Sequence, residues 1–222
     1  MGIVSLTNTD KLYWLGRYSE RVYTTIRLFG ESFDHLIEGE VQSIGAFCAS
    51  LNIPNLYTSG DDFVERYLFD AENPDSVFAN LTRAYDNAMT LREEIGSECV
   101  SYIQLAIYAM NSLRGSENPM FGLQKVVDDI LAFWGLSYDI IPDENVRNII
   151  KVGKRVERLD LYARLKLPKK DILREVRRLA VRISRTNLQY AQADIDRLMA
   201  LATAGETAYD EIVTLVDGLV KI

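Results

Sequence analysis

Two Glu-Arg dipeptides in matched surroundings are the residues of this 222-residue chain best suited to chemistry. The segment LGRYSERVYTTIRL, residues 15–28, aligns without gaps with VGKRVERLDLYARL, residues 152–165. The alignment pairs Gly16 with Gly153, Arg17 with Lys154, Glu20 with Glu157, Arg21 with Arg158 and Arg27 with Arg164. Paired carboxylates can act as acid and base, and guanidinium groups can bind an anionic substrate. The sequence therefore contains an internal repeat with the residue types of a binding or catalytic site.

Each copy of the repeat has an apolar and a charged side when it is placed on a helix at about 100° per residue. Solvated charged faces, held by pairs three and four residues apart, are one interpretation. A second interpretation starts from Arg92, which falls on the apolar stripe of a helix expected in the middle of the chain. A core-facing guanidinium needs a carboxylate partner or a route to solvent.

Glu20 and Glu157 are the partners that we expect for Arg92, with Glu94 and Glu98 as local alternatives. The resulting hypothesis places the two Glu-Arg helices near each other, around a partly buried polar centre that includes Arg92. Carboxylates flanked by arginines should have a lowered pKa, which suits ion pairing and ligand binding better than proton donation. Catalysis at this centre is the alternative, and no catalytic residue is assigned.

The composition disfavours a metal site and a catalytic thiol. The chain has a single histidine, His35, whereas a di-iron helical bundle needs a Glu-x-x-His motif from each of two helices. Zinc catalysis with its usual histidine ligands is disfavoured for the same reason. Cys48 and Cys99 match no metal-ligand spacing and are expected to be buried thiols in a reducing compartment. We therefore expect neither a metal nor a cofactor, and we expect His35 on a helix surface or at an interface.

Charge is unevenly distributed along the chain. The net charge is -7, yet residues 147–197 contain 15 Lys and Arg against 6 Asp and Glu, which leaves 10 against 26 elsewhere. One face of the helix expected after Pro168 carries the basic residues Lys170, Arg174, Arg177, Arg178, Arg182 and Arg185. A solvated face, or one docked on the acidic remainder, is the simplest interpretation. A surface for RNA or for an acidic partner, over residues 168–190, is the alternative.

Helical periodicity runs through nearly the whole chain, so the expected fold is an all-α, multi-helix bundle in one domain, residues 1–222. We expect helices at about 10–38, 41–51, 61–69, 73–95, 97–113, 122–134, 142–165, 168–201 and 206–220. Charged residues within the first thirty positions argue against a signal peptide, and no apolar stretch is long enough to span a bilayer. We therefore expect a cytoplasmic protein without a membrane segment.

Three separated blocks resemble the signature blocks of the bacterial alpha-E domain family, in the order of that family. They are LYWLGRYSERVYTTIRLF near the start, ENPDSVFANLTRAYDNAMTLREEIGSE at residues 72–98, and IIKVGKRVERLDLYARL later in the chain. The match retains Asn87, Arg92, Glu98 and both Glu-Arg pairs, but Met89 stands where the family commonly has arginine. These matched residues, with Arg17, are the candidate polar centre.

The resemblance implies a helical fold and a functional context. Alpha-E proteins are associated with circularly permuted ATP-grasp ligases and transglutaminase-like peptidases, in peptide or amide-bond synthesis and modification. The resemblance therefore implies an ATP-grasp protein as a partner and a peptide or small anionic molecule as a ligand. This chain lacks a glycine-rich phosphate loop after a strand, so we expect it not to be the ATP-binding subunit.

Overall fold

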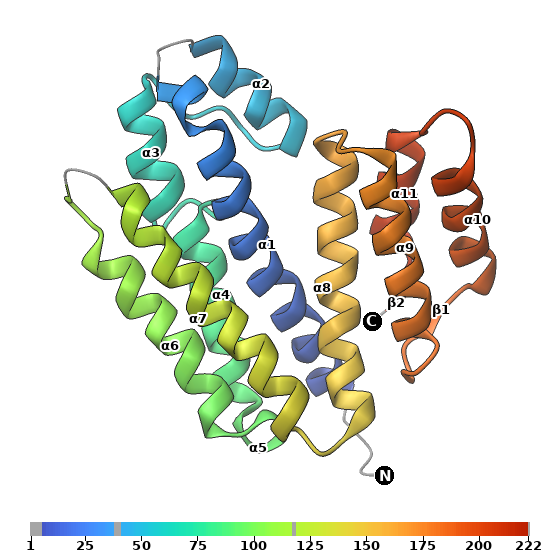
Figure 1. Cartoon of the computed structure of the whole chain (residues 1–222). Helices are drawn as coiled ribbons and strands as arrows, with labels where there is room; N and C mark the ends of the chain where they lie inside the picture. Colours follow the sequence, from blue (N-terminus) through green and yellow to red (C-terminus); the bar gives the residue numbers. More distant parts are fainter. Residues whose placement is uncertain (1–5, 38–40, 117–118, 222) are drawn as a thin grey trace. The chain divides into compact units, whose positions relative to one another are not determined.

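The computed structural model describes residues 6–37, 41–116 and 119–221, and most of them are helical (Figure 1). The all-α fold class is thus confirmed. The chain divides into two compact units, and the long helix α1 (Leu6–Ile37) contributes to both. Unit 1 consists of residues 1–20 and 141–222, and unit 2 consists of residues 21–140. The single domain expected from the sequence stays a prediction.

Unit 2 is built on three packed helices. Its elements besides α1 are α2 (Val41–Leu51), α3 (Gly60–Phe69), α4 (Val77–Thr90), α5 (Arg92–Ile95), α6 (Ser97–Ser112) and α7 (Pro119–Ile140). Helix α6 packs against both α4 and α7, and α3 packs against α4. The hydroxyls of Ser59 and Ser76 accept backbone N–H groups in the first turns of α3 and α4, which fixes where these helices begin. Phe63, Phe69 and Phe133 are fully buried in the core.

Unit 1 is built around α8 (Glu144–Arg164). Its carboxylate cap, Asp143, accepts the backbone N–H groups of Asn145 and Val146. Helix α8 packs against α9 (Lys169–Ile183) and α11 (Tyr209–Gly218), while α10 (Gln192–Thr203) packs against α9. Two short strands, β1 (Gln189–Tyr190) and β2 (Val220–Lys221), pair in antiparallel fashion.

The prediction of one long helix from residue 168 to 201 is wrong. Helix α9 ends at Ile183, and a turn, β1 and α10 follow it. After Ile183 the chain hydrogen-bonds locally instead of continuing the helix. The Thr186 hydroxyl donates to the Ile183 carbonyl, which offers the backbone an alternative to the helical hydrogen bond. The Asn187 backbone N–H then donates to the Asn145 side chain on α8, which ties this turn to its neighbour. Helix α7 also extends beyond the expected range on both sides.

No helix in the described ranges combines the length and the apolar character that a membrane crossing requires. The side chain of His35 lies outside the described residues, so its expected surface position stays a prediction.

Candidate functional site: a buried Glu-Arg clasp beside a basic helix pair

Helices α1 and α8 approach each other closely at the two glycines of the repeat. A Cβ atom on Gly16 would lie 2.1 Å from the Ile150 carbonyl oxygen of α8. A Cβ atom on Gly153 would lie 2.0 Å from the Tyr13 carbonyl oxygen of α1. The contact is reciprocal, because Ile150 and Tyr13 each lie three residues before the glycine of their own helix. Only residues without a Cβ permit this approach of two backbones.

Ion pairs cross between the helices beside this contact. Arg17 Nε donates to Glu157 Oε2 at 2.7 Å. Arg158 donates from Nε to Glu20 Oε1 at 2.5 Å and from Nη2 to Glu20 Oε2 at 2.9 Å. Each Glu of the repeat therefore receives a guanidinium from the other helix, and the Glu20 pair is bidentate. We call these four residues the clasp.

The clasp carboxylates are shielded from water. The side chains of Glu20 and Glu157 are 0% and 1% exposed, and those of Arg17 and Arg158 are 11% and 12% exposed. Burial alone would lower the pKa of Arg17, but Glu157, through its charge and hydrogen bond, acts with Tyr13 and Asp160 to outweigh burial, so the pKa is raised. Burial is likewise outweighed at Arg158, whose pKa is raised by Glu20 together with Glu175 and Tyr162. Removal of one partner from a buried pair of this kind lowers the free energy of unfolding by about 3–5 kcal/mol, because the other charge stays buried.

Lys154, which the repeat aligns with Arg17, lies in the same surroundings. Its pKa is lowered to about 6, chiefly by burial and further by the charges of Arg158 and Arg155. The carboxylates of Glu20 and Glu175 oppose this shift without cancelling it. Lys154 therefore lies beside the clasp largely as a neutral amine at pH 7.

The residues of the predicted polar centre are divided between the two units. The clasp residues Arg17, Glu20, Glu157 and Arg158 meet in unit 1, whereas Arg21, Asn87, Arg92 and Glu98 belong to unit 2. Within unit 2 the charge of Arg21 acts on the buried hydroxyl of Tyr67, where burial nevertheless raises the pKa. Asn87 is half-buried on α4, and Glu98 is exposed in the first turn of α6.

The expectation that Arg92 faces the core is wrong. Arg92 is exposed, and its Nε donates to the Ser97 hydroxyl at 2.8 Å. The helical wheel fails here because α4 ends at Thr90 and Leu91 leaves helical geometry, with φ -92° and ψ 14°. A new short helix, α5, then starts at Arg92. Leu91 itself is fully buried, so the apolar stripe ends one residue before Arg92.

The basic face expected after Pro168 is present but shorter than expected. Lys170, Arg174, Arg177 and Arg178 are exposed on α9 and Arg182 is half-buried, whereas Arg185 lies beyond the helix end. Glu175, which is 0% exposed, neutralises part of this face. Its carboxylate accepts Arg155 at 2.7 Å, Arg178 at 3.0 Å and Arg174 at 3.4 Å. Burial would raise the pKa of Glu175, but the charges of Arg155, Arg158 and Arg178 together outweigh burial, so that pKa is lowered.

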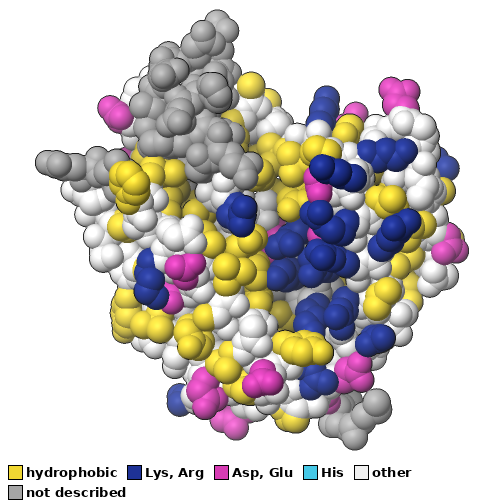
Figure 2. Space-filling view, in the orientation of Figure 1, with side chains coloured by type: hydrophobic (Ala, Val, Ile, Leu, Met, Phe, Trp, Pro, Cys, Tyr) yellow, Lys and Arg dark blue, Asp and Glu magenta, His cyan; other side chains and the backbone are white. Residues whose placement is uncertain are grey.

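A second row of cations on α8 completes this surface, and the sequence reasoning did not single it out. Arg147, Lys151 and Arg155 recur every four residues, so they share one side of α8. Figure 2 shows the Lys and Arg side chains gathered over α8 and α9. The four-residue spacing was visible in the sequence, but the antiparallel pairing of α8 with α9 was not.

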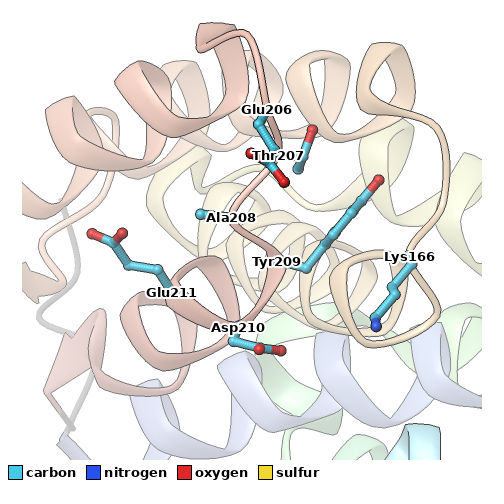
Figure 3. A pocket seen from close by; sticks show the side chains of 7 residues that line it. All are labelled: Lys166, Glu206, Thr207, Ala208, Tyr209, Asp210 and Glu211. Carbon is cyan, nitrogen blue, oxygen red and sulfur yellow. The ribbon is translucent and has the colours of Figure 1, made fainter.

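A hollow described in unit 1 has the opposite character. It measures about 500 Å³ and is lined by Lys166 and residues 206–211, among them Glu206, Asp210 and Glu211. Figure 3 shows these three carboxylates pointing in different directions rather than converging. Arg197 holds Glu211 by an ion pair of 2.6 Å. Among the described residues, no group of three His, Cys, Asp or Glu side chains is placed to hold a metal ion.

These features define an all-helical domain in which two Glu-Arg helices clasp each other. A family model described as a predicted alpha-helical domain with a conserved ER motif, named Alpha-E, matches residues 8–211. The chain therefore belongs to the Alpha-E family. No curated protein and no solved structure matches the chain significantly.

Proposed function

We propose that this protein is a non-ATP-binding component of an ATP-grasp-linked peptide or amide ligase system, in which it holds a partner or a substrate. Membership of the Alpha-E family supports the proposal, because the resemblance to that family implies an association with circularly permuted ATP-grasp ligases. The ligase would activate a carboxylate with ATP, and this chain would supply binding and orientation.

The observation that carries a non-catalytic role is the burial of the clasp. Glu20 and Glu157 were the residues best suited to acid-base chemistry, yet their side chains are 0% and 1% exposed. A general acid or base must reach the proton that it transfers, directly or through one water. Both carboxylates also accept short hydrogen bonds from guanidinium groups. The clasp is therefore better suited to fixing the helices than to acting on a substrate.

Reciprocal co-purification from the native host tests the proposal. A tagged copy of this protein should co-purify a circularly permuted ATP-grasp protein in near-stoichiometric amount, and the tagged ATP-grasp protein should return this chain. The mixture of both should hydrolyse ATP in the presence of the peptide substrate, whereas this chain alone should not.

A matched variant separates the scaffold role from catalysis. Glu20→Gln keeps the side-chain shape and removes the charge, and it is assayed at a temperature where circular dichroism shows the variant folded. The proposal predicts that the folded variant supports the activity of the mixture. Ligation or hydrolysis by this chain alone, abolished in folded Glu20→Gln, would overturn the proposal and establish an enzyme.

A further inference from the structure

The basic surface formed by α8 and α9 is the strongest charged feature of unit 1. We call it the cationic face and define it by seven side chains: Arg147, Lys151, Arg155, Arg174, Arg178, Arg182 and Arg185. Figure 2 shows Lys and Arg side chains gathered over α8 and α9. None of the seven belongs to the clasp.

The face consists of two facing rows joined by three contacts. Arg155 donates to Glu175 at 2.7 Å, Arg182 donates to Asn148 at 3.3 Å, and Arg185 lies 3.8 Å from Glu144. Residue numbers rise along one helix as they fall along the other, so the helices run antiparallel and the rows lie side by side. Eight residues separate Arg147 from Arg155, which is about 12 Å along a helix.

The cationic face keeps a net positive charge when the carboxylates within it are included. Glu144, Asp171 and Glu175 lie among the seven cations, which leaves a net charge of +4. The pKa of Lys151 is lowered to about 8, first by burial and then by repulsion from Arg182, Arg147 and Arg155. An anion bound between the rows would relieve this repulsion.

The dimensions of the face suit several anions on one short chain. Cations four residues apart on α8 are about 6 Å apart along the axis. Carboxylates at alternate positions of an extended peptide are about 6.6 Å apart, so three of them span about 13 Å, close to the length of the α8 row. The face already binds one carboxylate of the chain itself, because three guanidinium groups surround the Glu175 carboxylate.

Nucleic acid fits this face less well than peptide does. Single strands are held largely by stacking of bases on exposed aromatic rings, and Tyr162 is the one aromatic residue that α8 and α9 contain. The chain has a net charge of -7, so with +4 on the face the other residues sum to -11. The net negative charge of the chain repels a long polyanion more strongly than a short acidic segment.

We propose that the cationic face is a docking surface for an acidic segment of a partner protein, an extended stretch with Asp or Glu at alternate positions. The site follows from the residues of α8 and α9 and does not depend on the ligase role. Its failure and that of the ligase proposal are therefore separate outcomes.

Fluorescence anisotropy with labelled probes tests the docking surface on the full chain. The probes are a peptide of the repeat Glu-Ser, the same peptide with Gln in place of Glu, and a single-stranded RNA of equal charge. We expect the Glu peptide to bind, its affinity to fall steeply between 50 and 200 mM salt, and the Gln peptide not to bind. No binding of the Glu peptide, or equal binding of the Gln peptide, would overturn the proposal. Tighter binding of the RNA would show a nucleic-acid surface instead.

Matched charge variants locate the binding. Lys151→Gln with Arg185→Gln removes two charges from the face, and Lys166→Gln with Lys221→Gln removes two exposed charges outside it but in the same unit. The first pair should weaken binding of the Glu peptide about fivefold to tenfold and the second less than twofold. Equal effects of the two pairs would contradict the assignment of the site. Circular dichroism shows whether each variant is folded.

Discussion

Replacing either clasp glycine by alanine tests whether the two Glu-Arg helices touch backbone to backbone. The new Cβ atom would lie 2.1 Å from the Ile150 oxygen in Gly16→Ala and 2.0 Å from the Tyr13 oxygen in Gly153→Ala. Ordinary contact begins at 3.4 Å, so the helices must separate locally by 1.3 or 1.4 Å. Both obstacles are backbone atoms, so no change of rotamer relieves them.

The expected loss of stability follows from two opposing effects. Alanine favours a helix interior over glycine by about 1 kcal/mol. Overpacking costs about 1–3 kcal/mol, and separation of the helices also stretches the buried pairs, whose complete loss costs about 3–5 kcal/mol. We expect Gly153→Ala to lower the free energy of unfolding by about 2–4 kcal/mol.

Urea unfolding followed by circular dichroism measures this loss against two matched controls. A Cβ atom meets nothing within 4 Å at Gly135, inside α7, or at Gly218, at the end of α11 in unit 1. Gly135→Ala should stabilise its helix by up to about 1 kcal/mol, and Gly218→Ala should change little. A Gly153→Ala protein as stable as these controls would refute the close crossing of α1 and α8.

Three further predictions concern single side chains. Gly122→Ala should be tolerated, with a loss below about 1 kcal/mol in urea unfolding, because the atom it approaches at 2.0 Å is the tip of the flexible Leu113 side chain. Arg92→Leu should change the free energy of unfolding by less than about 0.5 kcal/mol because Arg92 is exposed, and a large loss would restore the buried-centre hypothesis. Lys154 has a pKa of about 6 in the folded protein against 10.5 ordinarily, so between these values the unfolded chain binds a proton that the folded chain does not. The wild type should therefore gain stability as pH rises through this window, and urea midpoints at several pH values should show that Lys154→Met removes this gain. Lys151→Met should remove only the part above about pH 8, and identical pH profiles for wild type and Lys154→Met would contradict the assignment.

The helices were largely predictable because their signals are local. Asp143 before an apolar periodic run marks the start of α8, and Ser59 marks that of α3. The breaks were harder to predict. Nothing in the apolar period distinguishes Leu91 from a helix interior, and the end of α9 depends partly on a hydrogen bond from Asn187 to Asn145, 42 residues away.

The clasp was predictable only in outline. The aligned glycines and Glu-Arg pairs suggested that the two copies share a task, but the reciprocal pairing depends on how α1 and α8 cross. The helical wheel assigned Arg17 and Glu20 to one charged side of the helix. Such a side is equally consistent with a face exposed to solvent and with a face that pairs with another helix. The sequence could not show that the opposite helix covers this side, nor that α8 adds a second cationic row to α9.

The central claim is that the Glu-Arg motifs form a buried structural clasp, and a double-mutant cycle of Glu20 and Arg158 tests it most directly. The free energy of unfolding is measured for wild type, Glu20→Met, Arg158→Met and the double variant. A clasp predicts a loss of about 3–5 kcal/mol in each single variant and a double variant no less stable than either, which gives a coupling of at least about 3 kcal/mol. Small, additive losses would mean that the pair lies free in solvent and would contradict the claim.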